Sequence, residues 1–185
     1  MVERPSKFGW SYLFPSLDLT PCKREKDDTD TRLAMLKLFD AGVKKVYVFG
    51  GLGGKHLDHS IANIQLIHEF TGKGMKAFLI SESEYLYVLK AGERVTYPSD
   101  SKGIISLFSL SEETTLSIRD LYYEYEGKID NKRAFTVSNE FHQKGGTIEV
   151  FEGAALIVRP VLFSEDHFNI SMYFPSTDSN FTPYQ

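Results

Sequence analysis

Apolar residues in the first part of the chain follow two patterns, helical spacing and short unbroken runs. Helical spacing favours α-helices, whereas short apolar runs favour strands covered on both faces. The expected elements are a helix from Thr29 or Asp30 to Gly42, a strand at Val46–Phe49, a helix ending near Phe70 and a strand at Met75–Ile80. This order predicts one slice of a doubly wound α/β sheet. Because two strands cannot stand alone, we expect further strands from elsewhere in the chain or from a partner.

After Ser81 the pattern changes to short segments rich in β-branched and aromatic residues, several of which alternate with polar ones. Alternation is typical of half-buried antiparallel strands, and the regular spacing predicts a β-sandwich or barrel. The expected strands are Tyr85–Leu89, Arg94–Tyr97, Gly103–Leu110, Thr114–Ile118, Leu121–Glu126, Thr147–Phe151 and Ala155–Val158. The predicted organisation is an unplaced segment 1–22, an α/β domain 23–82, a β-sandwich domain 83–160 and a C-terminal extension 161–185 with a short strand at Phe168–Phe174.

A glycine-rich turn joins the strand at Val46–Phe49 to the following helix. It contains Gly50, Gly51, Gly53 and Gly54 and is followed by Lys55. Such a turn at the carboxyl end of a strand offers N–H groups and a positive helix end to an anion. The spacing fits neither a Walker A loop nor the dinucleotide-binding fingerprint, so we expect a phosphate-binding turn of another kind.

Asn63 lies on the apolar side of the helix that follows the turn. A buried amide needs hydrogen-bond partners. Two interpretations remain open: the side chain is satisfied by nearby loop backbone, or it points into the crevice above the sheet.

Three acidic residues cluster at the start of the first helix, at Asp27, Asp28 and Asp30 beside Lys26. One or two acids are explained by capping and the helix dipole. The cluster also suits Mg²⁺, which takes one or two carboxylates together with phosphate oxygens and water.

Two other segments carry residue types that suit a site. His56, Asp58 and His59 have a spacing that could hold a transition metal in a metallohydrolase, although turn and capping hydrogen bonds explain the histidines more simply. The segment from Phe135 to Gly146 is most simply a bulged turn before a strand.

The bulk composition narrows the function classes. With 42% hydrophobic residues the chain supports a packed core, and 25 acidic against 21 basic residues give a charge of −4 without a basic run. These values argue against a nucleic-acid surface. No apolar run reaches the length of a membrane span. The single cysteine, Cys22, excludes an intrachain disulfide and favours a reducing, cytoplasmic location.

Three ordered motifs resemble those of the thiamin pyrophosphokinase family. They are a K-D-x-T-D helix start at Lys26–Asp30, a glycine segment from Gly50 to His59 with Asn63, and an S-N-E-F loop at Ser138–Phe141. The family has an α/β nucleotide-binding domain followed by an all-β domain. It transfers a pyrophosphoryl group from ATP to thiamin, giving thiamin diphosphate and AMP, and works as a homodimer with shared active sites.

The resemblance implies a role for each matching residue. Asp27 and Asp30 would hold Mg²⁺. Lys26, Gly50, Gly53, Gly54, Lys55 and Asn63 would bind or support the phosphates of ATP. Asp58, Lys55 and Asp30 would be catalytic, and Ser138 and Asn139 would face thiamin.

The resemblance departs from the family pattern in two places. Residues 1–22 contain no counterpart of the family's D-G-G turn and G-D-x-D-S segment, whose aspartates bind Mg²⁺, and the stretch from Gly54 to Asp58 is one residue longer than usual. We therefore also expect weakened activity, and we keep as an alternative a non-catalytic remnant that binds thiamin or dimerises.

Overall fold

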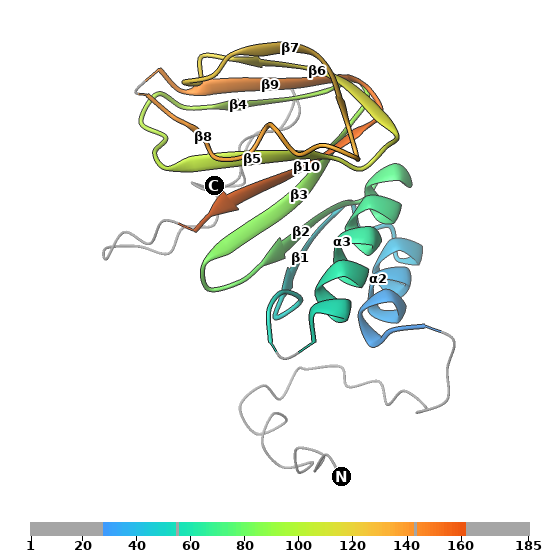
Figure 1. Cartoon of the computed structure of the whole chain (residues 1–185). Helices are drawn as coiled ribbons and strands as arrows, with labels where there is room; N and C mark the ends of the chain where they lie inside the picture. The colour runs from blue at the N-terminus through green and yellow to red at the C-terminus, as the bar shows by residue number, and fades with distance from the viewer. Residues whose placement is uncertain (1–27, 55, 143, 162–185) are drawn as a thin grey trace.

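The computed structural model describes residues 28–54, 56–142 and 144–161 of the 185-residue chain. These residues form three layers: two helices, a six-stranded sheet and a four-stranded sheet (Figure 1). The helices are α2 (Asp30–Asp40) and α3 (Leu57–Gly72). The strands are β1 (Lys45–Phe49), β2 (Lys76–Ile80), β3 (Glu84–Lys90), β4 (Glu93–Tyr97), β5 (Ile104–Ser109), β6 (Glu113–Arg119), β7 (Tyr125–Asp130), β8 (Asn139–Glu140), β9 (Gly146–Glu152) and β10 (Ala154–Pro160).

The larger sheet runs without interruption through both expected domains. Its order is β1-β2-β3-β10-β5-β8, whereas the smaller sheet has the order β4-β9-β6-β7. β1 and β2 are parallel, as expected of an α/β slice, and β3 then pairs antiparallel with β2. The boundary predicted near residues 81–84 therefore falls at a tight turn inside one sheet, where the chain changes from α/β to all-β structure.

Each face of the larger sheet has its own apolar core. Along β3, Tyr85, Tyr87 and Leu89 pack toward the four-stranded sheet, while Leu86 and Val88 pack toward the helices. This two-sided burial explains the unbroken apolar sequence of the strand. The sandwich predicted for the second half is thus present, with β3, β10 and β5 forming part of one of its sheets.

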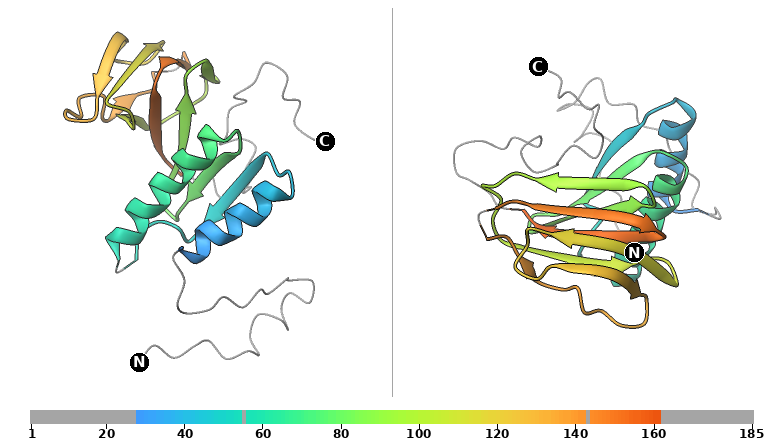
Figure 2. Two further views of the ribbon diagram at one scale, coloured as in Figure 1. Left: turned by 90° about the vertical axis from the view of Figure 1, so that its right-hand side faces the viewer. Right: turned by 90° about the horizontal axis from the view of Figure 1, so that it is seen from above.

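Both described helices lie on the same face of the larger sheet, as Figure 2 shows. The prediction of a doubly wound sheet was wrong for the residues that the structure describes. On the opposite face, β3 and β5 pack against strands of the four-stranded sheet and not against helices. No helix in these residues is long and apolar enough to cross a membrane.

Most predicted elements are confirmed within a few residues, but one strand was misplaced. Leu121–Glu126 was predicted as a strand, whereas β7 begins at Tyr125. Asp120 has a positive φ of 59°, and Leu121 forms only an isolated bridge with Phe141. The alternation of side-chain types at residues 121–124 therefore belongs to a bend and not to a strand. The strand predicted at Phe168–Phe174 lies outside the described residues.

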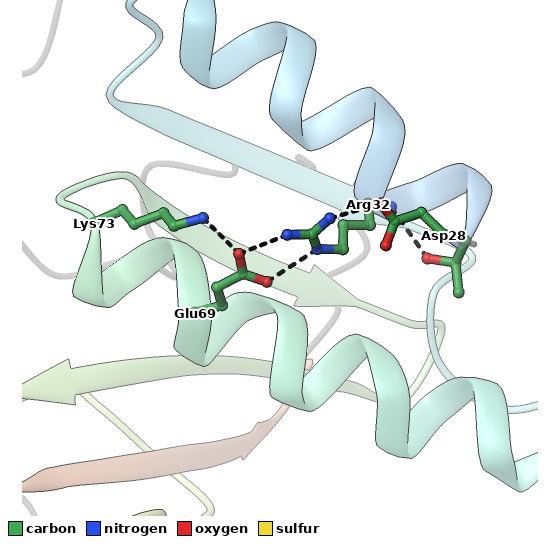
Figure 3. A network of polar contacts seen from close by, with 5 residues as sticks. Asp28, Arg32, Glu69 and Lys73 are labelled. Carbon is green, nitrogen blue, oxygen red and sulfur yellow. Dashed lines mark hydrogen bonds and ion pairs between the residues drawn. The ribbon is translucent and has the colours of Figure 1, made fainter. Parts of the chain in front are cut away.

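A network of charged side chains ties α2 to α3 (Figure 3). Arg32 donates from Nε and Nη2 to the two carboxylate oxygens of Glu69, over 3.2 and 3.0 Å. Its Nη1 donates to Asp28 Oδ2 over 2.7 Å, and Lys73 also binds Glu69. The hydrogen bond from Arg32, followed by that from Lys73, lowers the pKa of Glu69 to about 2.

We expect Glu69→Gln to lower the free energy of unfolding by about 1 kcal/mol at pH 7. A shift from 4.5 to about 2 corresponds to roughly 3 kcal/mol, and solvent screening of this partly exposed group reduces it. Because the pKa is lower in the folded state, the stabilisation is full above about pH 4.5 and disappears as the pH falls toward 2. Urea unfolding across this pH range measures it. Glu112→Gln, at an exposed 3.9 Å ion pair with Lys132, serves as the control, and equal effects of the two variants would contradict the prediction.

Candidate functional site

An open hollow of about 720 Å³ lies where β1 and β2 end. Phe49, Gly50 and residues 52–54 form one wall, and residues 80–84 form the other. Ligands of α/β sheets bind in this position, beyond the carboxyl ends of parallel strands. The glycine turn predicted to bind phosphate thus lines a hollow large enough for a substrate.

Two buried side chains of α3 hold the glycine turn in place. Asn63 Nδ2 donates to the carbonyl oxygen of Gly51 over 2.8 Å, and the backbone N–H of Gly53 donates to Ser60 Oγ over 3.0 Å. Of the two interpretations of Asn63, the structure shows the side chain satisfied by loop backbone. The N–H of Gly53 is already used by Ser60, so the turn can offer an anion only its other donors. Ser60 was missed from the sequence, although its position three residues before Asn63 places both on one side of the helix.

The backbone of the turn requires glycine at several positions. Gly50, Gly53 and Gly54 have φ values of 72°, 78° and 80°, which other residues adopt only with strain. Gly51 is needed for a different reason, because a Cβ there would lie 3.3 Å from the side chains of Val48 and Leu79. The turn is therefore seated directly on the sheet.

The N-terminus of α3 has no side-chain cap. His56 occupies the N-cap position without a capping hydrogen bond, and Asp58 lies in the first turn, with 3.8 Å between His56 Nδ1 and Asp58 Oδ1. Both side chains are largely exposed. The predicted capping role of His56 was therefore wrong. An uncapped helix start retains its affinity for an anion, but the Asp58 carboxylate opposes a phosphate unless a cation accompanies it. Lys55 lies outside the described residues.

The start of α2 shows capping rather than a metal cluster. Thr29 Oγ1 accepts from Arg32 N–H over 3.2 Å, which confirms Thr29 as the N-cap, and Asp28 is paired with Arg32. Asp30 is exposed in the first helical turn, while Lys26 and Asp27 lie outside the described residues. Within the described ranges no group of three His, Cys, Asp or Glu side chains could hold a metal ion. The metallohydrolase interpretation of His56, Asp58 and His59 gains no support from this arrangement.

Both helix starts nevertheless face the same end of the sheet. In Figure 1, α2 and α3 begin at the end where β1 and β2 finish. Asp30 and Asp58 thus lie at the same end of the sheet as the glycine turn, although neither lines the hollow. The acids that do line it are Glu82 and Glu84, which belong to none of the sequence motifs. Their only sequence signal was their position just after a buried parallel strand.

The Ser138–Asn139 segment forms a separate feature on β8. Ser138 is exposed, has a positive φ of 56° and donates its N–H to Ser106 Oγ. Asn139 is only 5% exposed. Its Oδ1 accepts from the N–H groups of Tyr123 and Glu140, and its Nδ2 donates to the Tyr123 carbonyl. The Asn139 amide is therefore engaged within the protein. It fixes an exposed pair of rings, Tyr122 and Tyr123, whose centroids are 4.9 Å apart.

The glycine turn and the Ser138–Asn139 segment lie at opposite edges of the larger sheet. β1 and β8 are the first and last strands of its order, so their axes are separated by about 24 Å at the usual strand spacing. Among the described residues, Gly50, Gly53, Gly54 and Asn63 of the predicted nucleotide set lie toward the β1 edge, and the predicted thiamin residues Ser138 and Asn139 lie at the β8 edge. The structure does not bring the two groups together within one chain.

Comparisons with known proteins agree with the motifs. Residues 15–79 match the family model described as thiamin pyrophosphokinase, catalytic domain. A thiamine pyrophosphokinase of Bacillus subtilis is 27% identical over 137 residues, which cover 73% of this chain and 64% of the relative. The chain is therefore similar in sequence to the thiamin pyrophosphokinases.

Solved structures of this family extend the likeness beyond residues 15–79. The crystal structure of thiamine pyrophosphokinase from Bacillus subtilis has a TM-score of 0.67 at 25% identity, covering 75% of this chain and 66% of that one. A thiamin pyrophosphokinase structure from Geobacillus thermodenitrificans has a TM-score of 0.66 at 26% identity, covering 83% of this chain and 70% of that one. The structural likeness to thiamin pyrophosphokinases therefore extends beyond the glycine turn into the β layers. The chain spans less than two thirds of the length of the Bacillus subtilis relative.

Proposed function

We propose that this chain transfers a pyrophosphoryl group from ATP to the hydroxyl of thiamin, giving thiamin diphosphate and AMP. One observation carries the proposal: a glycine turn, held by Ser60 and Asn63, lines a hollow at the carboxyl ends of β1 and β2. Its relatives, named thiamine pyrophosphokinases, support the choice of reaction.

We call the glycine turn and the two helix starts beside it the nucleotide half of the site. There the main task of the protein is to position the phosphates, because this reaction requires little covalent chemistry from protein groups. Gly50 and Gly54 allow close approach to the backbone, and Lys26 and Lys55 neutralise phosphate oxygens. Asp58 orients the attacking hydroxyl or accepts its proton. The uncapped start of α3 adds dipole stabilisation for the transferred group.

Mg²⁺ suits this half because acidic groups surround it. Glu82 and Glu84 line the hollow and Asp58 lies in the first turn of α3, so a bare triphosphate would be repelled. The described residues form no three-donor cage, but Mg²⁺ bound to ATP needs only one or two protein carboxylates. We assign these to Asp27 and Asp30. The ion would neutralise charge on the phosphate oxygens.

We call Ser138, Asn139 and the neighbouring Tyr122–Tyr123 bend the thiamin half of the site. There Ser138 contacts thiamin, and Asn139 fixes the bend that forms the binding surface. The exposed rings of Tyr122 and Tyr123 suit the cationic thiazolium of thiamin, because aromatic faces attract cations. Since the two halves lie at opposite sheet edges, we propose a homodimer in which one chain supplies the nucleotide half and its partner supplies the thiamin half.

The decisive assay incubates the chain with thiamin, ATP and Mg²⁺ and measures AMP and thiamin diphosphate together. We expect both products in equal amounts and a decrease of about 100-fold in kcat for Asp58→Asn, which removes a group proposed to act on the acceptor hydroxyl. Asp40→Asn, at the far end of α2, is the matched control. A folded wild-type chain that forms neither product would refute the proposed activity.

The alternative is a non-catalytic thiamin-binding or dimerising module. It predicts that calorimetry detects thiamin binding while no AMP forms, whereas the proposed enzyme requires both.

A further inference from the structure

Arg159 on β10 is a buried cation without a carboxylate partner among the described residues. It is only 7% exposed. Its Nη2 donates to the carbonyl oxygen of Lys102 over 3.0 Å, while its buried Nε has no hydrogen-bond partner in the part of the chain that the structure describes. Burying a guanidinium without a carboxylate is costly, so an apolar side chain would suit a purely structural role better.

Aromatic rings take the place of a counter-ion around this guanidinium. Its Cζ lies 4.4 Å from the ring centroid of Phe141, 4.8 Å from that of Tyr97 and 6.0 Å from that of Tyr85. Cation–π attraction is strongest when the cation is removed from water, as it is here. Arg159 is thus held by, and in turn holds, the rings of three separate segments.

The contacts of Arg159 converge on the segment that carries Ser138. Phe141 directly follows β8, and its N–H donates to the carbonyl oxygen of Gly103. Arg159 binds the neighbouring carbonyl, that of Lys102. It therefore secures both chain segments that meet at β8: the approach to β5 through Lys102, and the end of β8 through Phe141.

We propose that Arg159 is a positioning residue for the thiamin half of the site. It acts through Phe141 and the Lys102 carbonyl to fix the segment 138–141, and it does not itself contact substrate. The identity of the substrate in this proposal rests on the proposed function. The claim that Arg159 orders the segment 138–141 does not depend on that function.

The test compares Arg159→Met and Arg159→Lys with Arg94→Met, which removes an exposed arginine paired with Glu149 on the four-stranded sheet. We expect Arg159→Met to raise the KM for thiamin about tenfold and to leave the KM for MgATP within about twofold. Arg159→Lys should give a smaller rise, since it keeps the charge but loses the planar group that stacks on rings. Parallel changes in both KM values would overturn the proposal by showing a general structural effect.

Amide hydrogen exchange supplies a readout that needs no activity. In Arg159→Met, peptides covering residues 102–104 and 138–142 should lose protection, while β6 and β7 keep theirs. Unchanged protection at 138–142 would overturn the proposal even in an active enzyme. A loss there in a chain that does not turn over thiamin would uphold the positioning role and refute only the proposed function. If Arg159→Met does not fold, Arg159→Lys is judged by the same two criteria.

Discussion

Replacing Asn139 with leucine should lower the free energy of unfolding by about 3 kcal/mol and abolish thiamin binding. The substitution removes three hydrogen bonds and leaves the backbone N–H and C=O of Tyr123 without their partner. The Tyr122–Tyr123 bend would then lose its fixed position. Urea unfolding and calorimetric titration with thiamin measure the two effects.

Ser138→Ala tests whether Ser138 contacts thiamin directly, in contrast to the structural role assigned to its neighbour Asn139. Because Ser138 is exposed, we expect its loss to weaken thiamin binding while changing stability by less than about 0.5 kcal/mol. If Asn139→Leu instead weakened thiamin binding without loss of stability, Asn139 would be a direct ligand, contrary to the role assigned here.

Replacing Asn63 with leucine should lower the free energy of unfolding by about 2 kcal/mol and reduce kcat/KM for MgATP about 100-fold. The carbonyl of Gly51 loses its donor, and the larger apolar side chain displaces a turn that is already in close contact with the sheet. Small displacements of a positioned phosphate group have effects of this size. Unfolding in urea and steady-state kinetics with varied MgATP provide the measurements.

Gln65→Leu is the matched control on α3, since Gln65 is exposed and two residues away. It should leave both quantities nearly unchanged. A stable Asn63→Leu variant with normal kinetics would show that the glycine turn does not depend on α3, and the proposed nucleotide half would lose its main structural support.

Local signals in the sequence were sufficient to predict most elements of this fold. Thr29 caps α2 because its hydroxyl reaches an N–H three residues away, and Gly42 ends that helix because it adopts a positive φ. The apolar runs of β1 and β2 and the glycine turn between β1 and α3 were equally evident. These features depend on residues close together in the chain, which is why sequence alone determined them.

Where a residue's partners are distant in the chain, only the tertiary structure decided the outcome. Nothing local reveals that Asn63 binds Gly51, that Asn139 binds Tyr123, or that Leu121 leaves the expected strand to bridge Phe141. The same limit applies to Arg159, which follows the apolar run of β10 with no local sign of its three aromatic neighbours. Periodicity identifies which positions are buried. It does not identify the element that covers them, so it did not show that strands of a four-stranded sheet cover β3 and β5 on the face away from the helices.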